Sequence, residues 1–454
     1  SFSAAWRVTE EPWMQSIKNV MNSFKVRGSY GVIGNQDVPL GSYIPSISIT
    51  TPTKGTGYWL VNGAYAQYVS SAPALVDPAL TWEKVSTLDF GVDARFWKDK
   101  IGLTFDWYQR KTMDMLSAGD VIPSSVGASA PKQNFGELTT NGIELELSFN
   151  HQFDNGLRLN LSANYSDYTT EISKWAYAED PLYSNNYEGK RLGDIWGYKV
   201  DGLWQTDDFV YGADGKIQTT TINGKVTNVL KNHEAGYQVL YESGSFRYSP
   251  GDIKIKDLNG DGVINYGKQT LKDHGDLAVI GNTQPRHLYG FRIGANWKGV
   301  DFDVFFQGVG KREMWVTGNM VLPGWMSGET NFAHTLDYWS PENTGAFYPR
   351  PIDYGQSAKW NYITNDRYLL NMAYLRCKSA TIGYSFPEKL LKKVHINRLR
   401  VYASGENLFE FDHLGDNPID PEMQNTTQTS GDSRAFGRAY PYRRTVSFGI
   451  QLDF

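Results

Sequence analysis

The sequence lacks any long apolar run, although it is 454 residues long. A transmembrane helix needs about 20 predominantly apolar residues in succession, so this kind of membrane span is excluded. Cys377 is the single cysteine, which excludes an intramolecular disulfide framework and a cysteine-rich zinc site. Positive charge is not in excess either, because the formal net charge is −5, and this argues against a nucleic-acid partner. No charged and apolar leader follows Ser1, so we expect any export signal to lie outside this chain.

Aromatic residues and glycine are abundant instead. The chain holds 28 Tyr, 22 Phe, 14 Trp and 45 Gly, yet its mean hydropathy is only −0.46. Transmembrane β-barrels have such a polar average because only alternate residues of each strand face lipid. The composition therefore leaves a membrane barrel open beside a soluble β-protein.

The C-terminal residues show a strict alternation of apolar and polar side chains. Val446, Phe448, Ile450, Leu452 and Phe454 form the apolar set. A period of two predicts a strand with one apolar face, and a row of this length matches the roughly 9–11 residues with which a tilted strand crosses a bilayer core. We interpret Phe448, Ile450, Leu452 and Phe454 as a signal for insertion into the outer membrane. The alternative is an edge strand of a soluble β-sandwich.

The same alternation recurs along the chain, in pairs of strands joined by short turns. We predict strands at 2–8, 24–32, 88–96, 101–107, 143–149, 157–165, 289–297, 300–306, 375–386, 399–403 and 446–454. We also predict a short helix from Thr9 to about Asn22, a β-bulge near Ser379 and a helical turn within 387–397. The connections alternate between short and long, as in an up-and-down barrel with short periplasmic turns and long extracellular loops.

Charged residues occupy the other phase of these strands: Asp89, Asp93, Asp106, Glu144, Glu146, Arg158, Asp301, Asp303 and Arg400. A dry sandwich core would not tolerate them, whereas a water-filled lumen would. Bacterial single-chain barrels have an even number of strands, so about eleven strands need a companion piece of similar size. We predict an all-β fold in which residues 1–454 form the C-terminal part of one transmembrane antiparallel up-and-down β-barrel of 22 strands, the kind with a plugged lumen.

Several stretches resemble a known family. They are SFSAAWRVTEEPWM at the start, KVRGSYGVIGNQ (25–36), EGKRLGDIWGYKVDGLWQTDD (188–208), PGDIKIKDLNGDGVIN (250–265), AYLRCKSATIGYSFP (373–387), and VYASGENLF (401–409) together with Phe454. In this order, and over nearly the whole chain, they resemble the C-terminal half of the SusC/RagA family of TonB-linked outer-membrane transporters. The resemblance implies a barrel in the outer membrane of a Gram-negative bacterium, an N-terminal plug energised by TonB, and a SusD-like surface lipoprotein that closes over the substrate. The plug, the TonB box and the signal peptide are not in this chain.

The resemblance further implies an active importer of large nutrients and no enzyme. Oligosaccharides and other glycans are the usual cargo of the family, and peptides are carried by some members. The expected partners are a SusD-like lipoprotein, the N-terminal half of the same transporter, the TonB complex through the plug, and outer-membrane lipid; no cofactor is required. Two alternatives stay open, a secreted glycan-binding or glycan-cleaving β-protein and a passive porin.

One acidic loop suggests calcium. Asp257, Asn259 and Asp261 supply oxygens at positions 1, 3 and 5 of a calcium loop, followed by a glycine and by the carbonyl of Val263. Lys268 stands at position 12, where such loops carry a bidentate acid. An Asx-rich turn that needs no ion is the alternative.

Aromatic residues in the loops are candidates for substrate contacts. They are Trp59, Trp196, Tyr198, Trp204, Trp325, Trp339 and Trp360. Such rings stack on sugars or form a docking face for a lipoprotein, while packing within the loops and an interfacial girdle are the alternatives. The sequence contains neither a phosphate-binding glycine loop nor a nucleophile elbow, and its seven histidines show no ligand spacing.

Overall fold

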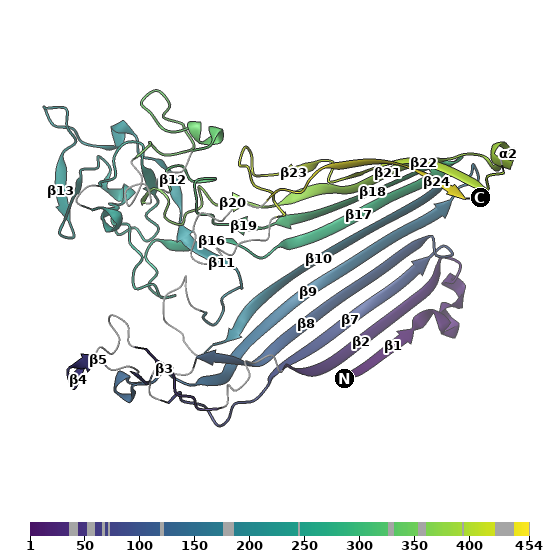
Figure 1. The fold of residues 1–454 in the computed structure, drawn as a ribbon, viewed down its shortest axis with the longest axis horizontal. Helices are drawn as coiled ribbons and strands as arrows, with labels where there is room; N and C mark the ends of the chain where they lie inside the picture. The colour runs from purple at the N-terminus through teal and green to yellow at the C-terminus, as the bar shows by residue number, and fades with distance from the viewer. Residues whose placement is uncertain are drawn as a thin grey trace.

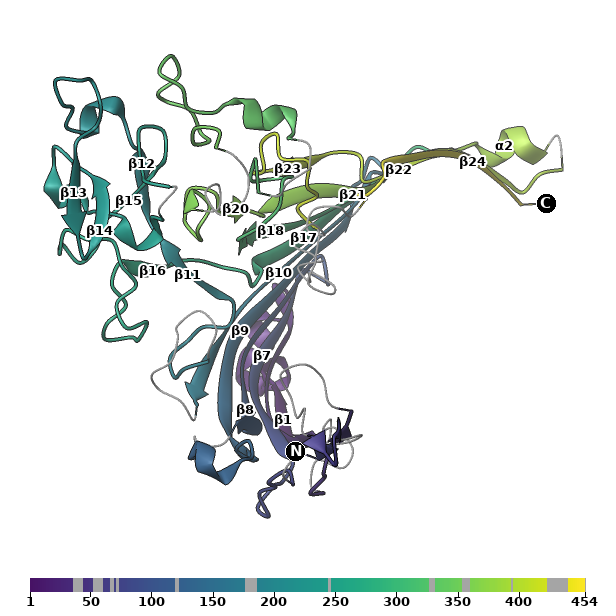
Figure 2. The ribbon, with the colours of Figure 1, turned by 60° about the vertical axis from the view of Figure 1, so that its left-hand side comes forward.

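The computed structural model describes residues 1–35, 44–51, 60–65, 69–70, 73–118, 122–175, 186–243, 246–325, 331–352, 360–392, 395–422 and 440–453. These residues form one large antiparallel sheet and a packed body of loops at one end of it (Figures 1 and 2). In the described part of the chain, no helix has the length and apolar character needed to span a membrane.

Eleven strands follow one another through the large sheet as β1-β2-β7-β8-β9-β10-β17-β18-β21-β22-β24, and β23 pairs with β21 off this path. Their bounds are β1 (Phe2–Arg7), β2 (Met21–Asn35), β7 (Glu83–Phe96), β8 (Ile101–Ala118), β9 (Lys132–Gln152), β10 (Arg158–Lys174), β17 (Arg286–Trp297), β18 (Val300–Lys311), β21 (Tyr374–Ser385), β22 (Arg398–Glu406), β23 (Glu410–Asp412) and β24 (Thr445–Asp453). The sheet is long, tilted and curved, with β1 and β24 at its two edges (Figures 1 and 2). The predicted fold class and all eleven predicted strands are confirmed.

Short turns join the strands at the end of the sheet opposite the loop body (Figure 1). Between β17 and β18, Lys298 and Gly299 both have positive φ, at 49° and 89°. These angles belong to a two-residue hairpin turn whose twist matches the flanking strands. The predicted helical turn is also found, as α2 (Glu388–Leu391). At the predicted bulge, Phe305 pairs with Ser379 but Phe306 pairs with Cys377, which leaves one extra residue in β21.

The predicted helix from Thr9 to Asn22 is wrong in type and in length. Two 3-10 helices stand there instead, η1 (Val8–Glu10) and η2 (Pro12–Ile17). Strand β2 begins at Met21 because the chain is already paired there with Phe96 of β7. Strand pairing thus takes the residues that a longer helix would need.

One face of the sheet carries large apolar side chains that protein does not cover. They include Phe90, Phe105, Leu147, Leu161, Ile293, Phe302, Ile382, Val401, Phe448 and Ile450. Phe448 is 83% exposed and Ile450 is 69% exposed. A continuous exposed apolar face of this extent requires another apolar phase against it, as the outer face of a membrane barrel has.

The loops that leave β10 and β18 fold together into one body, which we call the loop subdomain (described residues between 186 and 285, 312 and 372, and 413 and 419). It contains the strand pairs β11 (Asp194–Tyr198) with β16 (Leu277–Asn282), β12 (Val200–Leu203) with β15 (Ile253–Ile255), β13 (Thr219–Ile222) with β14 (Lys225–Asn228), and β19 (Glu313–Met314) with β20 (Leu370–Asn371). Short 3-10 helices are η4 (Thr206–Asp208), η5 (His233–Ala235), η6 (Val239–Tyr241) and η7 (Ala333–Leu336). A hydrophobic core from Tyr198 to Ile419 holds it together. The long loops after β10 and β18, which lie far apart in the sequence, therefore share one core.

The loop between β2 and β7 contains two small ladders among its described residues. They are β3 (Ile49–Thr50) with β6 (Val69–Ser70), and β4 (Leu60–Val61) with β5 (Ala64–Tyr65). The loop between β8 and β9 holds η3 (Ser124–Val126).

Candidate functional site

The sheet, which we call the wall, carries charged residues on its second face, and several of them form pairs across strands. The Arg27 guanidinium donates to Asp106 Oδ2 at 2.6 Å and to Asp93 Oδ2 at 3.3 Å. Further along the wall, Arg400 donates to both oxygens of Asp301, at 2.9 and 2.5 Å. These charges are only partly buried, so each pair keeps contact with solvent. The wall is thus a polar, wettable surface, as predicted for a lumen.

The loop subdomain brings together six of the seven aromatic residues singled out from the sequence. Trp204, Tyr198 and Trp339 lie in its core, with exposed fractions of 2%, 3% and 7%. Their polar atoms are satisfied inside the protein: Trp204 Nε1 donates to Gln238 Oε1 at 3.0 Å. These three rings retain little surface for a solute, which favours the packing role.

The other aromatic candidates lie nearer the surface. Trp196, Trp325 and Trp360 are partly buried and pack against the same core. Contact of these rings with a solute stays a prediction. Trp59 and Phe454 lie outside the described residues.

A buried polar network that the sequence did not predict ties the loop subdomain together. The wholly buried Asp252 carboxylate accepts hydrogen bonds from Nε and Nη2 of Arg350, both at 2.9 Å, and from Nδ2 of Asn361 at 2.9 Å. Asn361 Oδ1 in turn accepts from the Ile253 amide at 3.0 Å. Burial raises the pKa of Asp252, and the Arg350 guanidinium opposes that shift. The only signal in the sequence was that Asp252 stands in the PGDIKI stretch, and spacing alone could not supply its partners.

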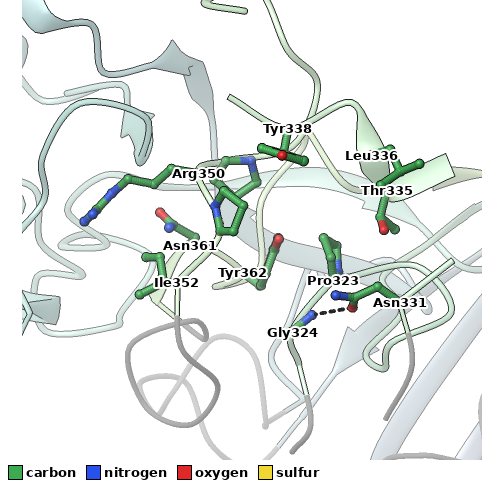
Figure 3. Close-up of a pocket in the computed structure, with 12 residues that line it drawn as sticks. Pro323, Gly324, Asn331, Thr335, Leu336, Tyr338, Arg350, Ile352, Asn361 and Tyr362 are labelled. Atoms are coloured by element: carbon green, nitrogen blue, oxygen red, sulfur yellow. Dashed lines mark hydrogen bonds between the residues drawn. The ribbon is translucent and has the colours of Figure 1, made fainter. Parts of the chain in front are cut away.

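A small cavity opens beside this network (Figure 3). Its volume is about 140 Å³, and its wall is mostly apolar. Leu336 and Tyr338 stand at its exposed rim, and Tyr362 lies deep in its wall. The nearby polar groups Arg350 and Asn361 are already bonded to Asp252. The cavity therefore offers apolar contact and few free hydrogen-bonding groups.

The predicted calcium loop is closed by its own backbone amides. Asp257 Oδ1 accepts from the Gly260 amide at 2.7 Å, and its Oδ2 accepts from the Gly262 amide at 2.8 Å. Asp261 Oδ1 accepts from the Val263 amide at 2.8 Å. Among the described residues, no group of three or more His, Cys, Asp or Glu is placed to hold a metal ion. The donor set matches the Asx-rich turn, and calcium binding at Asp257, Asn259, Asp261 and Val263 stays a prediction.

A second network fixes β23 and the segment after it to the wall. Arg376 of β21 is only 2% exposed, and its guanidinium contacts Glu410, Asp420 at 2.8 Å and Glu422 at 3.0 Å. Lys378 Nζ also contacts Glu422, at 2.9 Å. Burial acts to raise the pKa of Asp420, but the Tyr442 amide and Arg376 outweigh it and hold that pKa below its usual value. Two cations of β21 thus bind three carboxylates that follow more than 30 residues later in the chain.

Comparison with known proteins gives the same architecture. Residues 1–408 match the family model described as TonB dependent receptor-like, beta-barrel. TonB-dependent receptor P3 of Formosa agariphila is 27% identical over 470 residues, which cover 100% of this chain and 41% of that protein. TonB-dependent receptor SusC of Bacteroides thetaiotaomicron is 24% identical over 468 residues, which cover 100% of this chain and 40% of that protein.

A solved structure shares the fold. The RagAB peptide transporter superposes with a TM-score of 0.63 at 20% identity, over 100% of this chain and 43% of that one. The chain spans about two fifths of the length of the curated relatives described above. Because the family model covers most of the chain, the chain belongs to the TonB dependent receptor-like β-barrel family, and its eleven-strand wall is part of an outer-membrane barrel.

Proposed function

We propose that the full-length protein imports large nutrients across the outer membrane in a TonB-dependent manner. The observation that carries the proposal is the charged wall: cross-strand pairs such as Arg27 with Asp106 and Arg400 with Asp301 line the face opposite the apolar one. A polar wall beneath a folded loop subdomain suits a solute that is captured outside and then passes through. The relatives named above are receptors rather than enzymes, and the proposal assigns no catalytic role.

The proposal extends to partners. The free backbone edges of β1 and β24 need strands beside them, and the remaining part of the same barrel would supply these. A SusD-like lipoprotein would cover the loop subdomain, and a plug within the remaining part would couple the barrel to TonB. Oligosaccharides are the first expected cargo. Peptides are the second, because the structural neighbour is named as a peptide transporter.

Uptake by whole cells tests the transport step. A fluorescent oligosaccharide would be followed in wild-type cells, in cells without this transporter and in cells without TonB. Uptake that needs both proteins supports the proposal. Uptake that needs the barrel but not TonB would instead support the passive porin, and a protein that is soluble without detergent would support the secreted β-protein.

The partners are tested on the extracted complex. After detergent extraction, a denaturing gel with and without boiling is followed by mass spectrometry of each band. We expect a heat-shifted band, as folded barrels give, together with a SusD-like lipoprotein. A heat-shifted barrel that is recovered without any lipoprotein would contradict the proposed partnership while leaving the barrel intact.

A further inference from the structure

Strands β10 and β17 of the wall separate where they approach the loop subdomain. β10 and β17 pair as far as Ser166 with Leu288, but β10 continues to Lys174 beside β9. The stretch before β11 and the end of β16 occupy the space between β10 and β17. In this space, the Leu192 amide donates to Thr170 O of β10 at 2.9 Å. A groove of about 260 Å³ lies at this junction, which we call the neck groove and define by Tyr168, Arg191, Asp194, Asn282, Lys311 and Glu313. Its volume approaches the roughly 300 Å³ at which ligand pockets begin.

The carboxylates of the neck groove are already engaged by the protein. Asp194 Oδ1 accepts from Asn282 Nδ2 at 2.8 Å, and Asp194 Oδ2 accepts from the Arg191 amide at 3.3 Å. Glu313 Oε2 accepts from the Asn282 amide at 3.1 Å. Asn282 therefore binds both carboxylates, Asp194 through its side chain and Glu313 through its backbone amide. This leaves the two carboxylates fewer lone pairs for a ligand.

The cations of the groove are not all engaged. Arg286 is engaged in an ion pair, because its Nε and Nη2 both donate to Asp167. The Arg191 guanidinium makes no hydrogen bond or ion pair with any residue in the described ranges, although its own backbone is fixed by Asp194 and by a bridge to Glu171. Lys311 Nζ lies 3.6 Å from Glu313 Oε1, its one ion pair among the described residues, and its side chain is 57% exposed. Two cations with spare donors thus share one groove.

The carboxylates of the neck groove are hydrogen-bonded within the protein, whereas Arg191 and Lys311 keep spare donors. We therefore propose that Arg191 and Lys311 bind a carboxylate of the solute that the transporter carries. The planar fork of a guanidinium matches a carboxylate with two parallel hydrogen bonds, and the lysine adds a mobile point charge. Tyr168 also lines the groove, and we expect its ring to pack against the rest of the solute. A uronic acid of a glycan and the carboxyl end of a peptide share this chemistry. The inference rests on the proposed function, because it names the class of solute that the import route selects.

Binding measurements on the purified full-length transporter test the inference. The probes are two matched pairs: trigalacturonate with its methyl ester, and N-acetyl-trialanine with its C-terminal amide. Isothermal titration calorimetry at low salt should show the acid of at least one pair binding roughly tenfold more tightly than its neutral form. The pair that shows the preference tells a glycan from a peptide.

Variants then assign the preference to the groove. Arg191→Gln and Lys311→Gln should each reduce the acid preference, and the double variant should abolish it while the neutral probe binds as before. Lys216→Gln is the matched control, because Lys216 is an exposed cation elsewhere on the loop subdomain. A heat-shifted band on a denaturing gel shows that each variant is folded.

Two results would overturn the inference. One is an acid preference that survives in the double variant, and the other is equal binding of acid and neutral forms by the wild type. In either case, TonB-dependent uptake of a neutral oligosaccharide would leave the transport proposal standing. Loss of TonB dependence for every solute would instead remove the transport proposal.

Discussion

Tyr108 of β8 lies across Gly142 of β9, its direct partner in the antiparallel register. A Cβ atom on Gly142 would come within 2.4 Å of Tyr108 Cζ. The same relationship recurs in two more pairs, Tyr289 with Gly308 and Tyr402 with Gly449. In each pair the glycine leaves the space that the ring of the neighbouring strand fills, as aromatic side chains do over glycines in curved sheets.

Gly142→Ala should therefore destabilise the barrel. The new methyl group would push the Tyr108 ring out of its position, and overpacking of this kind costs about 1–3 kcal/mol. Gly294→Ala is the control, because a Cβ there meets its nearest atom, Asn160 O, at an ordinary 3.4 Å. The temperature at which the heat-shifted band unfolds measures both. Equal unfolding temperatures for the two variants would show that the Tyr108 ring moves aside freely.

The bond between Arg350 and Asp252 predicts a large effect inside the loop subdomain. Arg350→Ala would leave the wholly buried Asp252 carboxylate without its cation, and removal of one partner from a buried pair costs about 3–5 kcal/mol. We expect faster amide exchange at Ile253, which is bonded to Asn361 in the same network. Lys392→Ala is the control, since its pair with Glu388 is exposed and worth at most about 0.5 kcal/mol. Unchanged exchange at Ile253 in Arg350→Ala would contradict the role given to this network.

The sequence could predict the sheet because each strand carries its own evidence. Val446 to Leu452, for example, alternate whatever else surrounds them, and the turn at Lys298 and Gly299 is local. The loop subdomain could not be predicted in this way. Its core unites Tyr198 with residues as distant as Ile419, and contacts over such separations have no periodic signal.

The candidate sites show the same difference between local signals, which the sequence contains, and contacts between distant residues, which it does not reveal. Local chemistry identified the turn at Asp257, but the cation that holds Asp252 is 98 residues away, and the acids that hold Arg376 are 34 to 46 residues away. The aromatic candidates were chosen by residue type alone, so the sequence could not tell which rings are buried and which are exposed. Tertiary packing decides that question for each ring.

Glu242 predicts a dependence of stability on pH. Burial raises the pKa of this carboxyl, although Thr227 and the Tyr248 amide donate to its Oε1 and oppose the shift. Its Oε2 has no hydrogen-bond partner among the described residues. A raised pKa means that the folded state holds the proton more tightly than the unfolded chain. The contribution of Glu242 to stability is therefore fully present below the ordinary pKa of a glutamate and is lost as the pH rises through the raised value.

The comparison of wild type with Glu242→Gln isolates this effect. The amide keeps an acceptor for Thr227 and Tyr248 but cannot ionise. Between pH 4 and pH 7.5, the wild type should lose on the order of 1 kcal/mol relative to the variant, a typical cost for a buried group that lacks a partner. Thermal unfolding of the loop subdomain at both pH values measures it. A difference between the two proteins that stays constant with pH would show that Glu242 does not titrate in this range.

The lipid-facing row of β24 gives the last prediction. Ile450 is 69% exposed on the apolar face, and its neighbour Gln451 points to the opposite face. An arginine on the lipid face near the bilayer midplane costs about 2–4 kcal/mol, whereas the lumenal face tolerates charge. Ile450→Arg should therefore lower the amount of barrel assembled in the outer membrane, and Gln451→Arg should not. Quantifying the heat-shifted band in membrane fractions compares them. Equal loss in both variants would mean that strand pairing at this edge, rather than contact with lipid, limits assembly, and the interpretation of Phe448, Ile450 and Leu452 as an insertion signal would fail.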